Sequence, residues 1–298
     1  MKFDKKTAVR LAKASLWSYD FDESREVELL KFKGKSHIRD MKISDKRTIP
    51  TSFVGIVEYP DVIIVAFQGT ITKFGRDGVF SFETLIDWLQ NFEIKLLDKS
   101  KTSLPGKVHH GFFQQLELVY DQVVSALQTI KGKKPILVAG HSQGGAVAVL
   151  ATKRLHQDGF PVKATYTFAA PRCGDAVFAK SVKTPVHRVE FGHDVVPHLP
   201  PLLSQKSILG TAIVALNKIF DLPETIVALG QLASKTKKSH SYRSIGKLTY
   251  RKEETKLQTE LTASQEKSLF TERKRKLIKA GKSLVRHHGL ENYIGMFS

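Results

Sequence analysis

The sequence of 298 residues contains a single cysteine, Cys173, and no long hydrophobic run. One cysteine excludes an internal disulfide framework and favours a reducing compartment. The longest apolar stretch, 208–216, has about half the length that a membrane-spanning helix needs. The first residues are rich in charge and lack the apolar segment of a secretory signal. We therefore expect a cytoplasmic or peripheral membrane protein without a signal peptide or transmembrane helix. Export by a signal-independent route stays open.

Acidic residues are few compared with basic ones: 29 Asp and Glu stand against 47 Lys and Arg, which gives a formal net charge of +18. This excess predicts attraction to polyanions, and we expect peripheral contact with anionic membrane surfaces. Nucleic acid is not expected as a partner, because the basic run at 273–276 lies in no recognised nucleic-acid-binding module. His, Cys, Asp and Glu do not cluster at the spacing of metal ligands, so no metal or other cofactor is expected. The sequence does not indicate an oligomeric state.

Apolar patterns predict strands that alternate with helices. We expect helices over 7–19 and 111–130, and strands over 52–59, 61–68, 164–169, 186–191 and 242–250. This alternation is typical of a single α/β domain over 1–298 whose sheet is mostly parallel and flanked by helices. A helical insertion at about 202–236 and a basic amphipathic helix at about 264–286 complete the expected organisation.

A strand, a sharp turn and a helix are predicted around Gly140-His141-Ser142-Gln143-Gly144. The apolar run 135–139 precedes this Gly-x-Ser-x-Gly pattern, and a small-residue, helix-compatible run follows it. A serine hydroxyl is a poor nucleophile unless a neighbouring base takes its proton. A strained turn between strand and helix exposes the serine to such a base and to a substrate carbonyl. Ser142 is therefore the candidate nucleophile, and the alternative is a simple helix cap.

A serine nucleophile of this type needs a carboxylate and then a histidine later in the chain. Asp194 is the best carboxylate, because it follows the predicted strand 186–191 and precedes a proline-rich loop. Glu190 and Asp175 compete with it. Glu190 falls inside the strand, and Asp175 is typical of a turn or helix cap.

Six further blocks make the chain resemble the class 3 lipases, the fungal-lipase-like branch of the α/β-hydrolases. Besides the Ser142 turn, the matching segments are Phe67-Gln68-Gly69-Thr70, Asp87-Trp88, Val108-His109-His110-Gly111-Phe112, Phe168-Ala169-Ala170-Pro171-Arg172-Cys173-Gly174, the block from Asp194 to Pro201, and the tail from His288 to Ile294. The resemblance implies an α/β-hydrolase fold. It also implies a catalytic triad of Ser142, Asp194 and a histidine, with an oxyanion hole formed by Thr70 and the backbone N–H of Gln143.

The identity of the histidine is the open point. His288 is favoured, because the tail resembles the family block that carries the catalytic histidine. His240 precedes a predicted strand and is the main alternative, and His287 lies directly beside His288. The segment 71–86 occupies the place of the family lid, and its glycines favour mobility, although an ordinary surface loop is the alternative. The insertion at 202–234 is either a second lid or a pair of core helices.

The sequence therefore predicts a serine hydrolase of lipid acyl esters, acylglycerols or phospholipids, that acts through an acyl-enzyme intermediate. Gln68 stands where the family has an arginine, so an ion pair near the oxyanion loop is absent. The alternative function is a non-catalytic membrane- or lipid-binding protein on a hydrolase scaffold.

Overall fold

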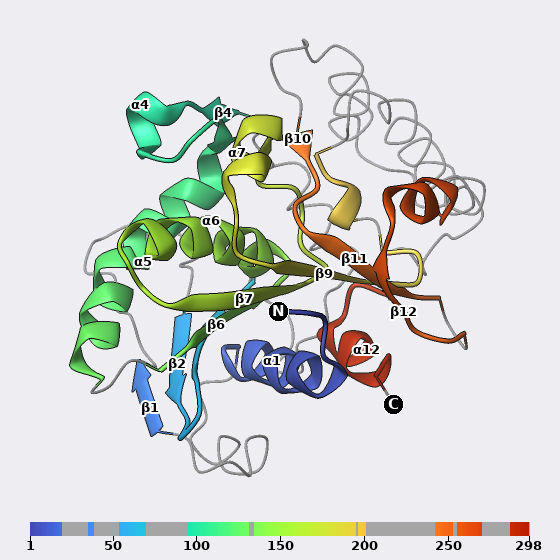
Figure 1. Ribbon diagram of the computed structural model, residues 1–298, viewed down its shortest axis with the longest axis horizontal. Coiled ribbons are helices and arrows are strands. Elements are labelled where there is room, and N and C mark those ends of the chain that lie inside the picture. The colour runs from blue at the N-terminus through green and yellow to red at the C-terminus, as the bar shows by residue number, and fades with distance from the viewer. Residues whose placement is uncertain are drawn as a thin grey trace, which may run out of the picture.

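The computed structural model describes residues 1–19, 35–38 (backbone alone), 54–69, 95–130, 134–194, 196–200, 242–252, 255–269 and 287–297. Across these ranges a single large sheet passes between two layers of helices (Figure 1). The helices α5 (His110–Thr129) and α6 (Gln143–Gln157) cover one face. The opposite face is covered by α1 (Lys5–Trp17) and α12 (Leu290–Gly295).

Within the described ranges the sheet contains eight strands in the order β1-β2-β3-β6-β7-β9-β11-β12. Strands β3, β6, β7, β9 and β11 run parallel to one another, and the outer pairs are antiparallel. In the order of the sheet, the strands are Lys35–Ile38, Val54–Glu58, Ile63–Phe67, Ile136–His141, Val162–Phe168, Val186–Phe191, Lys247–Arg251 and Gln258–Leu261. The predicted α/β class with a mostly parallel sheet is confirmed.

The continuous apolar run of β3 follows from its burial on both faces. Ile63, Val65 and Phe67 pack against the α5 and α6 layer. Ile64 and Ala66 point the other way, toward α1. Since side chains alternate along a strand, a strand between two helix layers needs apolar residues at every position.

The helices form where the sequence supplies a cap and one apolar stripe. Asp4 caps α1, because its carboxylate accepts a hydrogen bond from the N–H of Thr7 at 2.6 Å. The buried side of α5 repeats at helical spacing, as the pattern predicts. The small residues of α6 let it lie close against β6 and β7 and be buried over most of its surface.

The sequence predicts one continuous strand over 242–250, and this prediction is wrong. The chain forms β10 (Tyr242–Arg243) and then β11, which belong to different sheets. β10 pairs with β8 (Gly174–Asp175), in a small second sheet with β5 (Val108–His109) and β4 (Leu96–Leu97). Between β10 and β11, Gly246 has a φ of 93°, a left-handed conformation that turns the chain from one sheet to the other.

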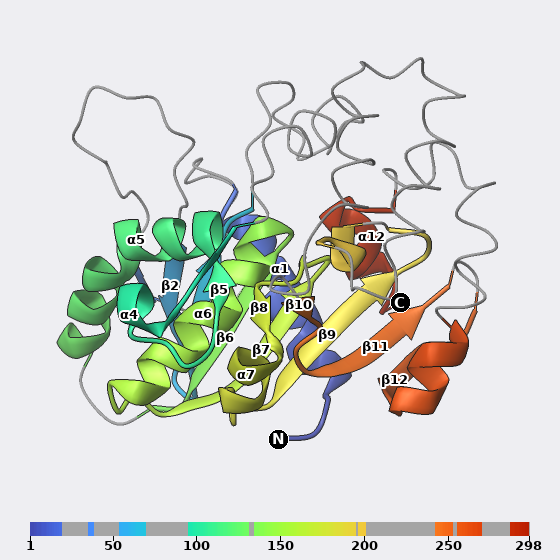
Figure 2. The same ribbon diagram turned by 90° about the horizontal axis from the view of Figure 1, so that it is seen from above.

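The carboxyl end of β9 lies beside α12, which places the C-terminal tail next to the residues that follow the central strands (Figure 2). Tyr293 of α12 accepts a hydrogen bond from the N–H of Phe191 at 3.3 Å. Ligands of parallel α/β sheets bind at the carboxyl ends of the strands. The fold therefore brings the tail to the edge where a site is expected.

The expected domain organisation stays a prediction. The insertion at 202–236 lies outside the described residues. Residues 263–269 are helical, which agrees with the start of the expected basic helix, and the rest of 264–286 also lies outside the described ranges.

Candidate active site

Ser142 occupies the turn between β6 and α6. Its backbone adopts φ 54° and ψ −130°, a region that residues with a side chain rarely occupy. The Ser142 N–H donates to the carbonyl of Phe168 at 2.8 Å, and the carbonyl of Ser142 accepts from the N–H of Gly145 at 2.9 Å. The side chain makes no capping hydrogen bond to α6. Ser142 therefore stands at the N-cap position of α6, but capping does not account for its hydroxyl.

Gly140 is required by the crossing of the two arms of this turn. A Cβ atom at position 140 would lie 2.2 Å from the carbonyl oxygen of Gly144. Such a contact is between fixed backbone atoms, so a larger residue would force the strand and the helix apart. The small residue that sequence reasoning expects beside the nucleophile therefore has a steric cause.

His288 lies between Ser142 and Asp194. Its Nε2 atom is 2.9 Å from Oγ of Ser142, and its Nδ1 atom is 2.9 Å from Oδ2 of Asp194. All three side chains are buried. The Ser142 hydroxyl donates to Nε2 when Nδ1–H donates to the carboxylate, which is the arrangement that activates a serine.

Asp194 accepts hydrogen bonds on both oxygens. Oδ1 accepts from the N–H of Val196 at 2.9 Å, and Oδ2 also accepts from the hydroxyl of Tyr293 at 2.6 Å. Burial and the charge of Asp194 raise the pKa of Tyr293 well above its usual value, so this phenol stays protonated and donates. Tyr293 lies within the tail from His288 to Ile294, but no sequence pattern indicates its role.

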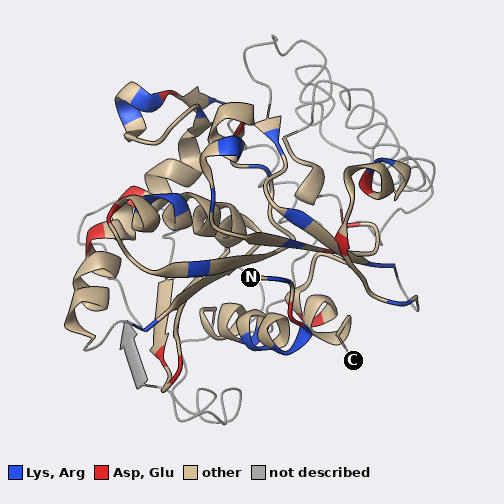
Figure 3. Cartoon of the chain, in the orientation of Figure 1, with Lys and Arg blue, Asp and Glu red and all other residues tan. Residues whose placement is uncertain are grey.

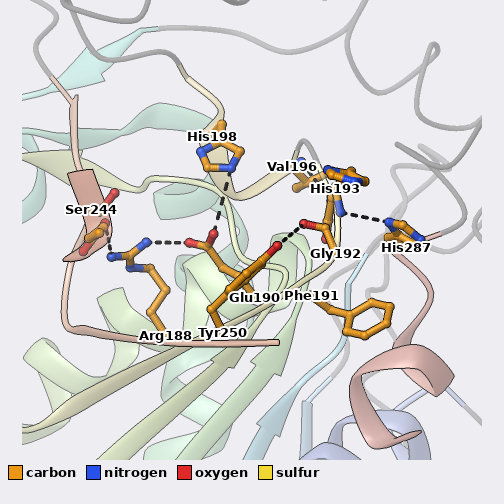
Figure 4. A network of polar contacts seen from close by, with 12 residues as sticks. Arg188, Glu190, Phe191, Gly192, His193, Val196, His198, Ser244, Tyr250 and His287 are labelled. Atoms are coloured by element: carbon orange, nitrogen blue, oxygen red, sulfur yellow. Dashed lines mark hydrogen bonds and ion pairs between the residues drawn. The ribbon is translucent and has the colours of Figure 1, made fainter. Parts of the chain in front are cut away.

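The acid loop, which we define as residues 192–194 and 196–200, is held by side chains from distant segments (Figure 4). The hydroxyl of Tyr250 donates to the carbonyl of Gly192 at 3.1 Å. The N–H of His193 donates to Nδ1 of His287 at 2.8 Å. The guanidinium of Arg172 donates to the carbonyls of His198 and Pro200, the latter at 2.7 Å.

Arg172 is buried, and burial together with the charge of Arg188 lowers its pKa to about 9. Its Nε–H also donates to the hydroxyl of Ser244 at 3.1 Å, and its backbone N–H donates to the carbonyl of Leu199 at 2.7 Å. Main chain and side chain of one residue thus fasten three consecutive residues of the acid loop. Arg172 lies inside the motif from Phe168 to Gly174, but the sequence alone does not show that this charged residue is buried.

The two competing carboxylates have other partners. Glu190 accepts from Nη1 of Arg188 at 2.5 Å, and its second oxygen lies 3.9 Å from Nε2 of His198 (Figure 4). Asp175 caps α7 (Ala176–Ser181) by accepting from the N–H of Phe178 at 2.8 Å. Both contacts agree with the structural interpretations made from the sequence.

The remaining predicted residues divide into two groups. Gln143 is described and begins α6 directly after Ser142, and His287 contacts the acid loop through its Nδ1 atom. Thr70, His240, the Asp87-Trp88 block, the expected lid at 71–86 and the insertion at 202–234 lie outside the described residues. The roles of Thr70 and Gln143 in an oxyanion hole stay predictions.

The described ranges contain no group of three or more His, Cys, Asp or Glu side chains placed to hold a metal ion. In the same ranges, no helix combines the length and the apolar character that crossing a membrane requires.

Comparison with known proteins gives consistent matches. Residues 79–204 match the family model described as Lipase (class 3). A secreted mono- and diacylglycerol lipase 1 of Fusarium solani is 37% identical over 124 residues, which are 39% of this chain and 36% of that protein. A lipase of Rhizomucor miehei is 35% identical over 105 residues, 32% of this chain and 29% of that protein. The chain thus spans about a third of the length of the curated relatives it matches.

Solved structures match over more of the chain. A lipase from Rhizopus microsporus var. chinensis has a TM-score of 0.60 and 19% identity, and the match covers 97% of this chain and 88% of that one. A mono- and diacylglycerol lipase from Aspergillus oryzae has a TM-score of 0.58 and 17% identity, with coverages of 89% and 85%. At 17% and 19% identity, this structural likeness shows a shared fold and nothing beyond it. Several relatives are named as secreted lipases, so the cytoplasmic location expected from the sequence finds no support in them.

Proposed function

We propose that this chain is a serine hydrolase of the class 3 lipase type that cleaves the carboxylic esters of acylglycerols. The observation that carries the proposal is the pair of 2.9 Å contacts that join Ser142, His288 and Asp194. The names of the relatives, which include mono- and diacylglycerol lipases, support an acylglycerol as the substrate class.

In this mechanism Ser142 and His288 carry out two proton transfers. Nε2 of His288 takes the proton of the Ser142 hydroxyl as Oγ attacks the ester carbonyl, and Asp194 stabilises the imidazolium that forms. His288 then protonates the leaving alcohol, which departs and leaves an acyl group on Ser142. Water attacks this acyl-enzyme with His288 as base, and the fatty acid and the free serine result.

The negative charge of each tetrahedral intermediate needs hydrogen-bond donors placed in advance. We propose that the N–H of Gln143 and the residue Thr70 supply them. Gln143 suits this role because it begins α6 immediately after the nucleophile. The helix N-terminus adds a favourable field for an anion at this position.

A titration of released fatty acid tests the proposed activity. Emulsions of monoolein, diolein and triolein are incubated with the wild type, Ser142→Ala and Ser181→Ala. Ser181 is the matched control, because its hydroxyl donates to the carbonyl of Phe178 at 2.7 Å in α7, away from the site. We expect turnover that falls by about 10⁴-fold or more in Ser142→Ala and stays within about twofold of wild type in Ser181→Ala. No fatty acid release by the wild type, or full activity in Ser142→Ala, would overturn the proposal.

We also propose that the protein approaches its substrate at anionic lipid surfaces. The net charge of +18 supports this, and Figure 3 shows Lys and Arg on α1 and α4 (Lys99–Thr102) among the described elements. Each basic residue near such a surface contributes about 1 kcal/mol. Flotation with vesicles of neutral or anionic lipid, at low and high salt, tests it. Binding that ignores both lipid charge and salt contradicts it.

A further inference from the structure

Tyr19 joins three segments that are far apart in the sequence. It lies two residues after the end of α1, and its hydroxyl lies 2.9 Å from Nδ1 of His141, the residue before Ser142. The backbone N–H of Gly69, just beyond β3, donates to the same hydroxyl oxygen. No sequence pattern indicates a role for Tyr19, and in the sequence His141 stands only as part of the serine motif.

His141 continues this chain of contacts to the base. Its Nε2 atom is 2.8 Å from the backbone carbonyl oxygen of His288. A carbonyl only accepts, so the proton of His141 resides on Nε2. In a neutral imidazole the other nitrogen then accepts, and the Tyr19 hydroxyl therefore donates to Nδ1. For a neutral His141, only one arrangement of protons satisfies these contacts.

The surroundings keep His141 neutral. Burial lowers its pKa to about 3, and a charge on His288 acts in the same direction. The two imidazole rings lie 5.0 Å apart between centroids. A cation on His141 would oppose the imidazolium that His288 must become during turnover. As a neutral ring His141 fixes the backbone of His288 without this repulsion.

The Gly69 end of β3 is held by the same hydroxyl. A Cβ atom at position 69 would lie 2.1 Å from the Tyr19 hydroxyl oxygen and 3.1 Å from Cβ of Ser142. Gly69 thus passes between Tyr19 and the nucleophile. The following residue is Thr70, a proposed oxyanion donor.

We propose that Tyr19 is a positioning residue for ester hydrolysis: through His141 it fixes the backbone of His288, and through Gly69 it fixes the strand end that leads to the oxyanion donor. The proposal rests on the proposed function, since it assigns Tyr19 a role in that reaction. Tyr19 touches none of the reacting atoms. Its effect is to keep the base in register with Ser142.

The test compares Tyr19→Phe with Tyr166→Phe. Tyr166 is the control, because its hydroxyl also accepts one backbone hydrogen bond, from the N–H of Asp4 at 3.1 Å, on the amino-terminal side of α1. We expect kcat of Tyr19→Phe to fall by about 10- to 100-fold with KM within about twofold. Tyr166→Phe is expected to keep kcat within about twofold.

Substitutions at His141 show whether the effect passes through this residue. His141→Gln places an amide N–H where Nε2–H lies and is expected to keep most of the activity, whereas His141→Leu loses the donor and is expected to behave like Tyr19→Phe. The Tyr19→Phe and His141→Leu effects are expected to be less than additive, because both act on one contact chain.

Nitrogen-15 NMR of labelled histidine gives a readout that does not depend on turnover. The wild type should show His141 protonated at Nε2 alone between pH 5 and pH 8, and Tyr19→Phe should shift the Nδ1 resonance. A protonated Nδ1, an unchanged kcat in Tyr19→Phe, or equal losses in Tyr19→Phe and Tyr166→Phe would each overturn the proposal. An inactive wild type with the expected His141 resonances would instead count against the proposed function.

Discussion

Ser142 is positioned by a backbone turn between β6 and α6, whereas Asp194 is positioned by side chains that reach its loop from several distant segments. In the turn the important contacts are local: the positive φ of Ser142 and the approach of Gly140 to Gly144. In the acid loop they span long sequence separations, such as 58 residues between Tyr250 and Gly192 and 94 between His287 and His193.

We therefore expect the turn and the acid loop to respond differently to the loss of a single hydrogen bond. A turn fixed by main-chain geometry tolerates the loss of any one neighbouring hydrogen bond. A loop fixed by buried polar side chains depends on each of them, because truncation leaves buried partners without hydrogen bonds. The Ser142 turn is thus fixed by its own main chain, and the acid loop is fixed by side chains from other segments.

The largest expected effect separates the two adjacent histidines. His288→Ala is expected to lower kcat/KM by about 10⁴-fold or more, because it removes the base. His287→Ala removes the acceptor of the His193 N–H and the ring contacts with Phe191 and His193, and it is expected to cost about tenfold. Steady-state hydrolysis of monoolein measures both, and the reverse order would show that the wrong histidine has been assigned.

The next effect concerns the carboxylate and the phenol that contacts it. Asp194→Asn puts an amide beside Nδ1 of His288 and favours the wrong tautomer, so we expect a loss of about 10⁴-fold in kcat. Tyr293→Phe removes one of several donors to Asp194 and is expected to cost about tenfold. A Tyr293→Phe variant as inactive as Asp194→Asn would mean that the phenol itself takes part in the chemistry.

Arg172 tests the dependence of the acid loop on buried partners. Arg172→Met leaves the carbonyls of His198 and Pro200 without their donor, and we expect the free energy of unfolding to fall by about 2–4 kcal/mol. The control is Arg154→Met, which loses a more exposed pair with Glu117 and a contact over Tyr120, and is expected to cost about 1 kcal/mol. Urea unfolding compares them, and equal costs would contradict the account.

The last prediction is a pH dependence at His141. Its pKa is about 3 in the folded protein and near 6.5 when unfolded, so between these values only the unfolded state binds the proton. Stability contributed by the neutral ring is therefore present above about pH 6.5 and is lost as the pH falls. The expected slope is up to about 1.4 kcal/mol per pH unit. Urea unfolding at several pH values should give a shallower slope for His141→Gln, and an identical slope would refute this origin.

The contrast between the turn and the acid loop also explains which features of the structure could be predicted from the sequence and which could not. The fold class, the order of most elements and the Ser142 turn depend on local patterns, apolar periodicity and small residues, which are visible along the chain. Asp194 can be singled out in the same way, because it lies three residues after the end of β9. The break between β10 and β11 was missed, because it depends on which sheet each half joins.

The roles of Tyr19, Arg172 and Tyr293 could not be predicted for the same reason. Each acts on a residue far away in the sequence, as in the 122 residues between Tyr19 and His141 or the 99 between Tyr293 and Asp194. No periodicity encodes such a pair. A buried position for a polar residue is the physical signal, and it exists only once the chain is folded.

The central claim is that Ser142 is a nucleophile activated by His288. Labelling with a fluorophosphonate, followed by mass analysis of the modified peptide, tests it without any choice of lipid. We predict one label, on Ser142, that disappears in Ser142→Ala and forms about 10³-fold or more slowly in His288→Ala. A folded wild type that takes up no label, or a label on Ser142 that forms at the same rate without His288, would contradict the account.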